Sequence, residues 1–387
     1  MSKPANSATE AVAPFKPLNC RALIVHDWLQ GMHGSERVVH AMQELFAGGA
    51  DVATFVADPR KLPEELSSRV VRTSKLGRLP GLRPSASSPG RWRYLLPFMP
   101  WWFRRLPTDG YDVVLSSSHA CALGVRAPRG VPHVAYIHTP IRYVWNADLD
   151  QRVPRGARSL ARALFTCLRI VDRRASTSPD VLIANSSAVR ERIRSVWNRD
   201  AAVVHPPTSL ESARTRQATR SPDTLLWVHR FVDYKRPLEV AQAFELLPDL
   251  NLVMVGVGPL SDRVKREAPP NVTVHGWLER DELERLLMSA AGFIHVGLED
   301  FGISMVEALA SGTPVLALNQ GGALDIVRDG VDGLLIGSAR PHEIASAARS
   351  MVNREWDPDL LRDRARAFSR ERFLHSLRDV LVSQGLS

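Results

Sequence analysis

Apolar runs of about five residues alternate with amphipathic stretches along most of this chain. The runs are rich in β-branched residues and bounded by turn formers, which is typical of buried strands, whereas the stretches between them have helical periodicity. This alternation predicts an α/β fold built on parallel sheets. The predicted strands are 21–26, 52–56, 112–116, 133–138, 181–184, 202–205, 224–229, 251–255, 272–275, 292–296, 314–318 and 333–336. The predicted helices are 36–46, 187–197, 237–246, 281–290, 303–311 and 342–352.

The strand series restarts after a His-Pro-Pro segment at 205–207, and the residues that follow are mostly polar. A chain of 387 residues is also long enough for two domains that each bury a core. We therefore expect a Rossmann-like domain at 19–206 and a second one at 207–369. Doubly wound sheets bind ligands beyond the carboxyl ends of their strands, so two such domains would form a cleft with a shared site.

The composition is that of a soluble globular protein, with 44% hydrophobic and 24% charged residues. Residues 1–18 are rich in Ala, Ser and Pro and lack the apolar segment of a secretory signal, so we expect a disordered arm. No apolar run approaches the roughly 18 residues that span a bilayer, and we expect a cytoplasmic protein. The three cysteines and twelve histidines show no metal-ligand spacing, so we expect no metal and no cofactor.

The formal net charge is +9, and the excess is concentrated in two segments. Residues 69–105 hold nine Lys and Arg and no acid, with an aromatic stretch inside them, and residues 152–174 hold seven Arg and one acid. This predicts an anionic partner: phosphate, nucleic acid or acidic lipid. One interpretation of 69–105 is a membrane contact, with Arg on head groups and Trp92, Trp101, Trp102 and Phe103 at the interface. The alternative is a solvated basic face with its aromatic side chains packed inward.

The most informative segment runs from Glu299 to Glu307, after a predicted strand. Its helix should begin near Gly302, so the free amides from Gly302 through Ile303 to Ser304 offer an anion site suited to a diphosphate. Carboxylates accept hydrogen bonds from two hydroxyls, which suits sugar and ribose rings. The alternative is that both acids lie in solvent or complement the helix dipole.

Arg230 and Lys235 follow the first strand of the second half. Two cations in one strand-to-helix loop can close on a pyrophosphate and neutralise the charge of a departing nucleotide. The alternative is an exposed basic pair. The glycines at 256 and Gly258 also end a strand, where they permit either close approach to a ligand or a plain tight turn.

Two further positions lie at strand ends in the first half. Gly34 opens a helix after the first strand and could bring a backbone amide to a phosphate, although a full GxGxxG pattern is missing. His138 ends another strand, where its ring could bond a sugar hydroxyl, but a lone histidine is more often structural.

Together these residues resemble the retaining glycosyltransferases of the GT-B fold, the group 1 type that includes bacterial mannosyltransferases of polysaccharide assembly. The match covers nearly the whole chain from about Arg21. It rests on the E-x7-E pair Glu299 and Glu307, the R-x4-K pair Arg230 and Lys235, and the turn at Gly34.

The resemblance implies roles for these residues. Glu299 would hold donor-sugar hydroxyls, Glu307 the ribose, the amides after Phe301 the phosphate, and His138 would line the reaction centre. The base would lie against the backbone near Gly276 and Trp277, and a final helix at about 370–387 would cross back to the first domain. Such enzymes need no metal and close two domains over the donor.

The segments 112–119 and 136–145 resemble a mannosyltransferase-like branch, which favours GDP-mannose as the donor and a glycan or polyprenyl-linked acceptor at the inner face of the cytoplasmic membrane. UDP- and ADP-sugars stay open. A nicotinamide oxidoreductase shares Rossmann halves but should carry GxGxxG, and a nucleic-acid-binding protein should carry a reader motif. Neither is visible, so we expect no nucleic-acid partner.

Overall fold

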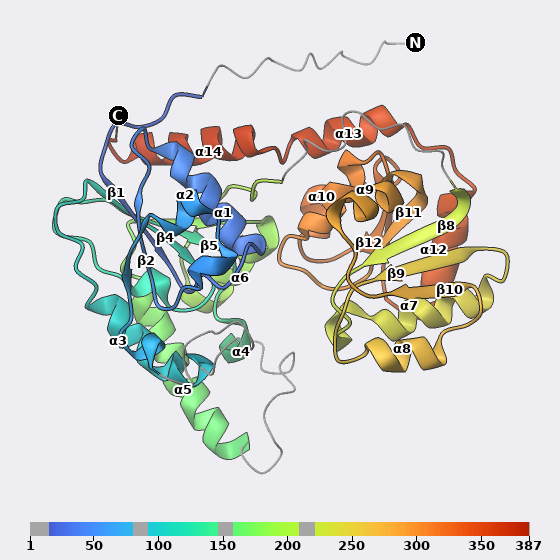
Figure 1. Cartoon of the computed structure of the whole chain (residues 1–387), viewed down its shortest axis with the longest axis horizontal. Coiled ribbons are helices and arrows are strands. Elements are labelled where there is room, and N and C mark those ends of the chain that lie inside the picture. The colour runs from blue at the N-terminus through green and yellow to red at the C-terminus, as the bar shows by residue number, and fades with distance from the viewer. Residues whose placement is uncertain (1–14, 80–91, 146–157, 209–220, 387) are drawn as a thin grey trace.

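The computed structural model describes residues 15–79, 92–145, 158–208 and 221–386. Two α/β lobes lie side by side (Figure 1). The first lobe holds a seven-stranded sheet in the order β3-β2-β1-β4-β5-β6-β7, and the second a six-stranded sheet in the order β10-β9-β8-β11-β12-β13. All strand pairs within the two sheets are parallel, as the alternating pattern predicts.

The first lobe follows the predicted strand order, but the pattern did not predict the strand β3 or the helices α2, α3, α4 and α5. Its strands are β1 (Ala22–His26), β2 (Asp51–Thr54), β3 (Val70–Thr73), β4 (Val113–Ser118), β5 (His133–Ile137), β6 (Val181–Ala184) and β7 (Ala202–Val203). Its helices are α1 (Gly34–Met42), α2 (Glu64–Ser67), α3 (Met99–Arg104), α4 (Arg142–Trp145), α5 (Arg158–Ala175) and α6 (Ser187–Trp197).

The second lobe begins at β8, and the last helix of the chain packs on the first lobe instead of the second. Its strands are β8 (Ser221–Val228), β9 (Asn251–Val255), β10 (Val272–His275), β11 (Ala290–His295), β12 (Val315–Leu318) and β13 (Gly333–Ile336). The helices of the C-terminal half are α7 (Pro237–Ala243), α8 (Ser261–Glu267), α9 (Arg280–Ser289), α10 (Ile303–Ala310), α11 (Ala323–Ile326), α12 (Pro341–Val352), α13 (Pro358–Arg366) and α14 (Arg370–Ser383).

Each sheet is covered by helices on both faces. In β1, Ile24 packs into one buried cluster while its neighbours Leu23 and Val25 pack into another on the opposite face. In β8, Trp227 and Leu226 divide between two clusters in the same way. Successive strand side chains point to opposite faces, so strands buried on both sides form continuous apolar runs.

The chain crosses between the lobes twice. Helix α14 packs on the first lobe through Phe373, Leu374 and Leu377, which are buried with the core around β1. Just before α14, the two segments that connect the lobes are in contact: the Thr208 amide donates a hydrogen bond to the Phe368 carbonyl at 3.0 Å. Figure 1 shows α13 and α14 following one another along one side of both lobes.

The N-terminal end of the fold begins earlier than the composition suggests. Residues 1–14 of the predicted arm lie outside the described residues. Leu18, in contrast, is fully buried in the first core, and its amide donates to Leu45 at 2.7 Å. Residues 15–18 therefore belong to the first lobe, since an apolar pair, Phe15 and Leu18, packs there despite the polar and proline-rich surroundings. Among the described helices, none combines the length and apolar character needed to cross a bilayer.

Candidate functional site

The predicted lysine and the first predicted glutamate form an ion pair. Lys235 follows β8 and Glu299 follows β11, and these strands are neighbours in the sheet, so their loops share one edge. The Lys235 Nζ meets Glu299 Oε1, and both side chains are largely buried. A Cβ at Gly297 would lie within about 3 Å of the Tyr234 carbonyl and the Lys235 backbone, so glycine permits this close approach of the two loops.

Two neutral histidines surround Lys235. His229 Nδ1 lies 3.5 Å from Lys235 Nζ, and the His295 ring packs edge-on against His229 with centroids 4.4 Å apart. Burial, reinforced by the Lys235 charge, lowers the pKa of both imidazoles well below their ordinary range. The rings therefore add no positive charge beside Lys235. His229 directly follows β8 and His295 is the last residue of β11, and this position at a strand end is the signal that could have identified them in the sequence.

Helix α10 begins where the sequence predicts, at Gly302, which caps it with φ of 101°. This left-handed conformation favours glycine. The first amides of the helix, from Ile303 and Ser304, have no acceptor within the helix and face outward at its start. The Ser304 hydroxyl lies 3.3 Å from His295 Nδ1. The start of α10 thus has amides that are free of intrahelical acceptors, and their binding of a phosphate stays a prediction.

The Phe301 ring supports this loop from beneath. It is buried, stacks on His205 at 5.4 Å between centroids, and packs against Phe368 at 5.6 Å. Gly322 donates from its amide to the Glu299 carbonyl at 2.9 Å, and a Cβ at Gly322 would overlap the Phe301 backbone. Phe301 therefore positions the loop through its buried ring, and that ring is not available to a ligand.

Glu307 faces the first lobe. Its Oε1 lies 3.5 Å from Arg37 Nη1 of α1, a residue that the sequence did not single out. Burial raises the pKa of the Glu307 carboxyl, and Arg37 opposes that shift. A Cβ at Gly34 would lie 3.5 Å from Ile303 Cδ1, so the N-termini of α1 and α10 meet across the lobes. The structure thus brings the predicted Gly34 to the predicted phosphate loop.

His138 lies in a cluster of first-lobe imidazoles at the ends of β1, β4 and β5. Its Nε2 lies 2.8 Å from the Ser117 hydroxyl, and its ring is 6.2 Å from His26 and 6.1 Å from His119. Burial and these neighbours lower the pKa of His138 well below its ordinary range. His138 is neutral at pH 7, which suits a hydrogen bond to a hydroxyl rather than a charge contact.

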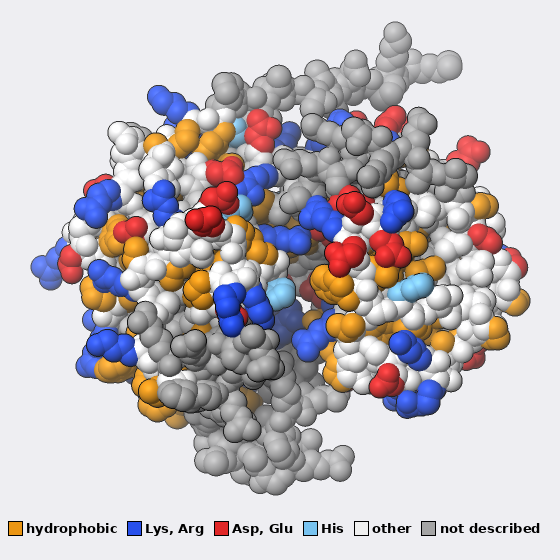
Figure 2. All heavy atoms as spheres, in the orientation of Figure 1, with side chains coloured by type: hydrophobic (Ala, Val, Ile, Leu, Met, Phe, Trp, Pro, Cys, Tyr) orange, Lys and Arg blue, Asp and Glu red, His pale blue; other side chains and the backbone are white. Residues whose placement is uncertain are grey.

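The remaining predicted residues line the edge beyond β8, β9 and β10. Arg230 is exposed, and a Cβ at Gly258 would overlap the Phe231 backbone. The glycine turn therefore packs on the loop that carries Arg230, which supports the tight-turn interpretation. At the end of β10, Gly276 is open, and the Trp277 side chain is 80% exposed. Figure 2 shows Lys and Arg side chains on both sides of the hollow between the lobes.

Three residues missed by the sequence join the lobes next to Glu299. Asp300 binds Arg142 of α4 at 2.5 Å and also binds Arg192 of α6. No local sequence pattern could indicate these contacts, because Arg142 and Arg192 are separated from Asp300 by 158 and 108 residues along the chain.

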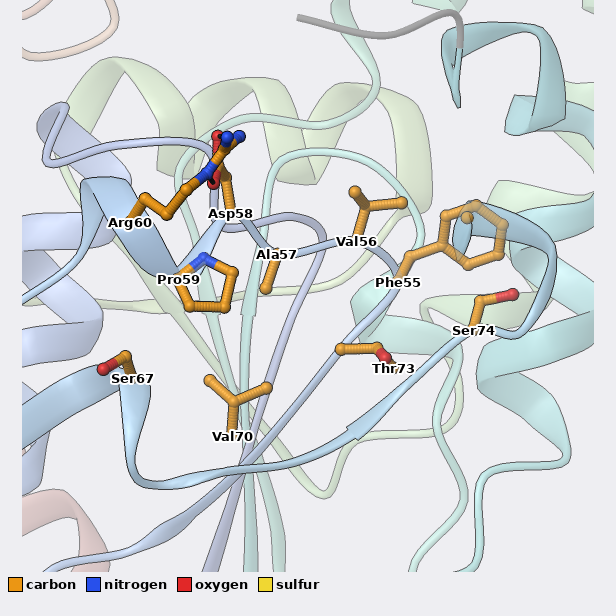
Figure 3. A pocket seen from close by; sticks show the side chains of 11 residues that line it. Phe55, Val56, Ala57, Asp58, Pro59, Arg60, Ser67, Val70, Thr73 and Ser74 are labelled. Atoms are coloured by element: carbon orange, nitrogen blue, oxygen red, sulfur yellow. Dashed lines mark hydrogen bonds and ion pairs between the residues drawn. The ribbon is translucent and has the colours of Figure 1, made fainter. Parts of the chain in front are cut away.

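A pocket of about 450 Å³ lies in the first lobe beside the edge strand β3 and the segment after β2. Figure 3 shows Phe55 and Ser74 on one side of it and Pro59 and Ser67 on the other. The wall therefore combines apolar surface with hydroxyl groups. Asp58 accepts two hydrogen bonds from Arg60, at 2.8 and 2.9 Å.

The aromatic side chains of the basic segment 69–105 divide between core and surface. Phe103 is buried, and Trp102 packs on it and on Phe55, contrary to the predicted interfacial position of all four rings. Phe98 and Trp101 are instead 55% and 56% exposed, and the Arg105 guanidinium lies 4.4 Å from the Trp101 ring centroid. Residues 80–91 lie outside the described residues, as do the side chains of 92–94.

Two family descriptions match the chain in succession. "Glycosyltransferase Family 4" matches residues 32–212, and "Glycosyl transferases group 1" matches residues 211–372. The first match covers the first lobe from residue 32 onwards, and the second covers the second lobe and ends at the start of α14.

Curated relatives are similar over part of their length. A D-inositol 3-phosphate glycosyltransferase of Nocardioides sp. is 27% identical over 71% of this chain and 67% of that protein. The sulfoquinovosyl transferase of Arabidopsis thaliana is 24% identical over 61% of this chain and 49% of that protein. A GDP-mannose-dependent alpha-mannosyltransferase of Corynebacterium glutamicum is 34% identical over 27% and 25%. The matches thus span from a quarter to two thirds of these relatives.

Solved structures share the whole two-lobed arrangement. The Anabaena protein HepE, solved in complex with UDP, superposes with a TM-score of 0.68 at 17% identity over 94% of this chain and 100% of its own. Sucrose-phosphate synthase from Thermosynechococcus elongatus gives the same TM-score and identity over 94% and 98%. At this identity the likeness concerns the fold.

Proposed function

The chain belongs to the group 1 glycosyltransferases and has the GT-B fold, as the sequence predicted, and from this we propose that it transfers a hexose from a nucleotide sugar with retention of configuration. The observation that carries the proposal is the Lys235–Glu299 pair beside the open start of α10. A cation, a carboxylate and free amides on one edge suit a diphosphate joined to a sugar.

We propose a front-face reaction. The acceptor hydroxyl oxygen bonds to the anomeric carbon on the side from which the nucleotide leaves, while the bond from that carbon to the phosphate oxygen breaks. The hydroxyl proton passes to the departing phosphate oxygen, so the products are the glycoside and the nucleoside diphosphate. Lys235, Arg230 and the α10 amides stabilise the negative charge that develops, which is the role a metal ion has in other transferases.

The remaining roles follow from position. Glu299 orients the sugar hydroxyls, and Glu307 receives the ribose after exchanging its contact with Arg37. His138, neutral at the first-lobe edge, accepts or donates one hydrogen bond near the reacting hydroxyl. Orientation of two reactants of this kind supplies a large part of the rate enhancement.

We propose GDP-mannose as the donor. The mannosyltransferase-like segments 112–119 and 136–145 and the similarity to the Corynebacterium enzyme support this choice. UDP-sugars are the alternative, supported by HepE structures in complex with UDP-glucose. ADP-sugars are a third candidate.

We propose that the acceptor is a glycan or polyprenyl-linked sugar that approaches the first lobe at the inner face of the cytoplasmic membrane. The pocket beside β3 offers apolar and hydroxyl surface for such a ligand. Phe98, Trp101 and Arg105 form an exposed aromatic and basic group that suits acidic lipid head groups. Cosedimentation with phosphatidylglycerol vesicles at low salt tests this: binding that F98S/W101S loses supports the contact, and unbound wild-type protein excludes it.

The donor is tested by binding and then by turnover. Thermal stabilisation is compared for GDP, UDP, ADP, NAD and duplex DNA, and hydrolysis for GDP-mannose, UDP-glucose and ADP-glucose. Stabilisation by GDP with hydrolysis of GDP-mannose supports the proposal. Stabilisation by NAD or DNA, with none by a nucleoside diphosphate, would favour an oxidoreductase or a nucleic-acid-binding protein instead.

Lys235→Ala should lower turnover by about a hundredfold or more without unfolding the protein, because the charge on the leaving diphosphate loses its buried cation. Lys265→Ala is the matched control, since Lys265 is exposed on α8. Equal turnover in the two variants contradicts the assignment of Lys235.

A further inference from the structure

Asp300 is the meeting point of the two lobes. It lies between Glu299 and Phe301 in the proposed donor loop, and its side chain is only 13% exposed. Each carboxylate oxygen receives one arginine from the first lobe: Arg142 Nη2 donates to Oδ2 at 2.5 Å, and Arg192 Nη1 donates to Oδ1. Guanidinium–carboxylate hydrogen bonds are among the stronger polar contacts in proteins.

The backbone of the same residue is also held by the first lobe. The Ser186 hydroxyl donates to the Asp300 carbonyl at 2.5 Å, and Ser186 is itself fixed as the N-cap of α6, where it accepts from the Val189 amide at 3.1 Å. One residue further, the Ser187 amide donates to Asp325 at 2.6 Å. The start of α6 therefore contacts both the loop that holds Asp300 and the helix α11 of the second lobe.

Arg142 reaches both proposed donor loops. Besides Asp300, its guanidinium lies 5.7 Å from the ring centroid of Tyr234, which stands directly before Lys235. Arg192 is also held by a residue of its own lobe, because its Nη1 donates a hydrogen bond to the Thr139 hydroxyl at 2.7 Å. Arg192 is thus oriented within the first lobe before it meets Asp300, whereas the contacts of the Arg142 guanidinium are with the second lobe.

We propose that Asp300, Arg142 and Arg192 form an interlobe latch that sets the position of the donor loop only when the lobes are closed. These are positioning residues: they act on Glu299 and on the α10 amides, which touch the donor in the proposed function on which this inference rests. Closure and completion of the donor site then become one event.

The charges of the latch favour a donor-dependent closure. Two guanidinium groups face one carboxylate, so the closed latch keeps one surplus positive charge beside the diphosphate site. When the lobes open, all three groups regain water, which limits the net stability of the closed state without donor. A bound diphosphate adds attraction to the surplus charge and shifts the population towards closure.

The latch can be tested without any substrate. Hydrogen–deuterium exchange is measured on the full chain for wild type, Asp300→Asn, Arg192→Gln and Asp200→Asn. Asp200 is the matched control, because it also binds two arginines, Arg190 at 3.0 Å and Arg194 at 3.1 Å, but within the first lobe. We expect faster exchange in segment 299–304 in both latch variants and unchanged exchange there in Asp200→Asn.

Turnover gives the second readout. With GDP-mannose or UDP-glucose, whichever wild type hydrolyses, Asp300→Asn and Arg192→Gln should each raise donor KM and lower kcat/KM by about tenfold or more, since small misplacements of reacting groups are costly. The double variant should resemble the single ones, because both break the same contact. Asp300→Glu should recover part of the loss.

The outcomes separate the two proposals. If wild type hydrolyses neither donor, the proposed function fails for those donors, and the exchange data still judge the latch. If Asp300→Asn and Arg192→Gln match Asp200→Asn in exchange at 299–304, or if their effects on kcat/KM simply multiply in the double variant, the latch is overturned. Either latch variant suffices if the other does not fold.

Discussion

At the scale of single residues, glycines allow loops to come together where the site forms. Gly297 lets the Lys235 loop approach Glu299, and Gly322 lies against the Phe301 backbone. At both positions a side chain would collide with neighbouring backbone atoms, so the site requires the space that glycine leaves. The same holds for Gly321, where a Cβ would lie 2.5 Å from the Glu299 carbonyl oxygen, so both residues of the pair Gly321 and Gly322 are required to be small.

Gly322→Ala should destabilise the second lobe by about 1–3 kcal/mol, because the new methyl group overlaps backbone atoms that have no room to move. The displaced Glu299 loop should also raise donor KM. Gly48→Ala is the control, since a methyl group there meets nothing within 4 Å. Urea unfolding measures the difference, and equal stability of the two variants contradicts the steric argument.

Buried histidines make the first lobe sensitive to acid. Burial lowers the pKa of His133 from 6.5 to about 4. Between these values the unfolded chain binds a proton at this residue and the folded protein does not, so stability falls as pH drops from about 6.5 to about 4.

His133→Gln should reduce the pH slope of the unfolding free energy in this window by up to about 1.4 kcal/mol per pH unit, which is one proton. The variant also alters the hydrogen bond to Ser116 at 2.9 Å, so absolute stability will shift and the slope is the diagnostic quantity. His342→Gln, at an exposed position, should leave the slope as in wild type. Denaturant unfolding between about pH 4.5 and 7 provides the measurement.

At the scale of elements, agreement with the sequence follows burial. Helix α6 spans the predicted residues 187–197, and the central strands β1, β4 and β5 appear where apolar runs predict them. Edge strand β3 was missed, because its residues are half-buried or exposed and include Arg72, so no apolar run marks it. A periodicity argument detects an element only when one of its faces, or both, are buried.

Helix α14 belongs energetically to the first lobe although it follows the second in sequence. Leu377→Ala should destabilise the protein by about 2–5 kcal/mol, because it leaves a cavity in the core around β1. Val382→Ala, on the same helix but 41% exposed, should change stability by about 0.5 kcal/mol or less. Thermal unfolding measures the loss of stability in the two variants. A loss for Leu377→Ala as small as that for Val382→Ala would show that the helix contributes little to that core.

At the scale of the whole molecule, the sequence predicted the fold of the two lobes but not the contacts between them. Glu299 and Lys235 could be placed together because adjacent parallel strands bring their following loops to one edge. No such rule could predict the contacts of Arg37, Arg142 and Arg192, since each of them binds a carboxylate of the other lobe. Contacts of this kind depend on the relative placement of two separately folded units, which local patterns do not encode.

The double crossing between the lobes restricts how they can move. The segments at Thr208 and Ser369 run parallel and are joined by a backbone bridge, so the two connections between the lobes are tied to each other at this point. Two connections joined in this way allow fewer relative motions of the lobes than a single connection would. Each closure should therefore bring Asp300 back to the same two guanidinium groups.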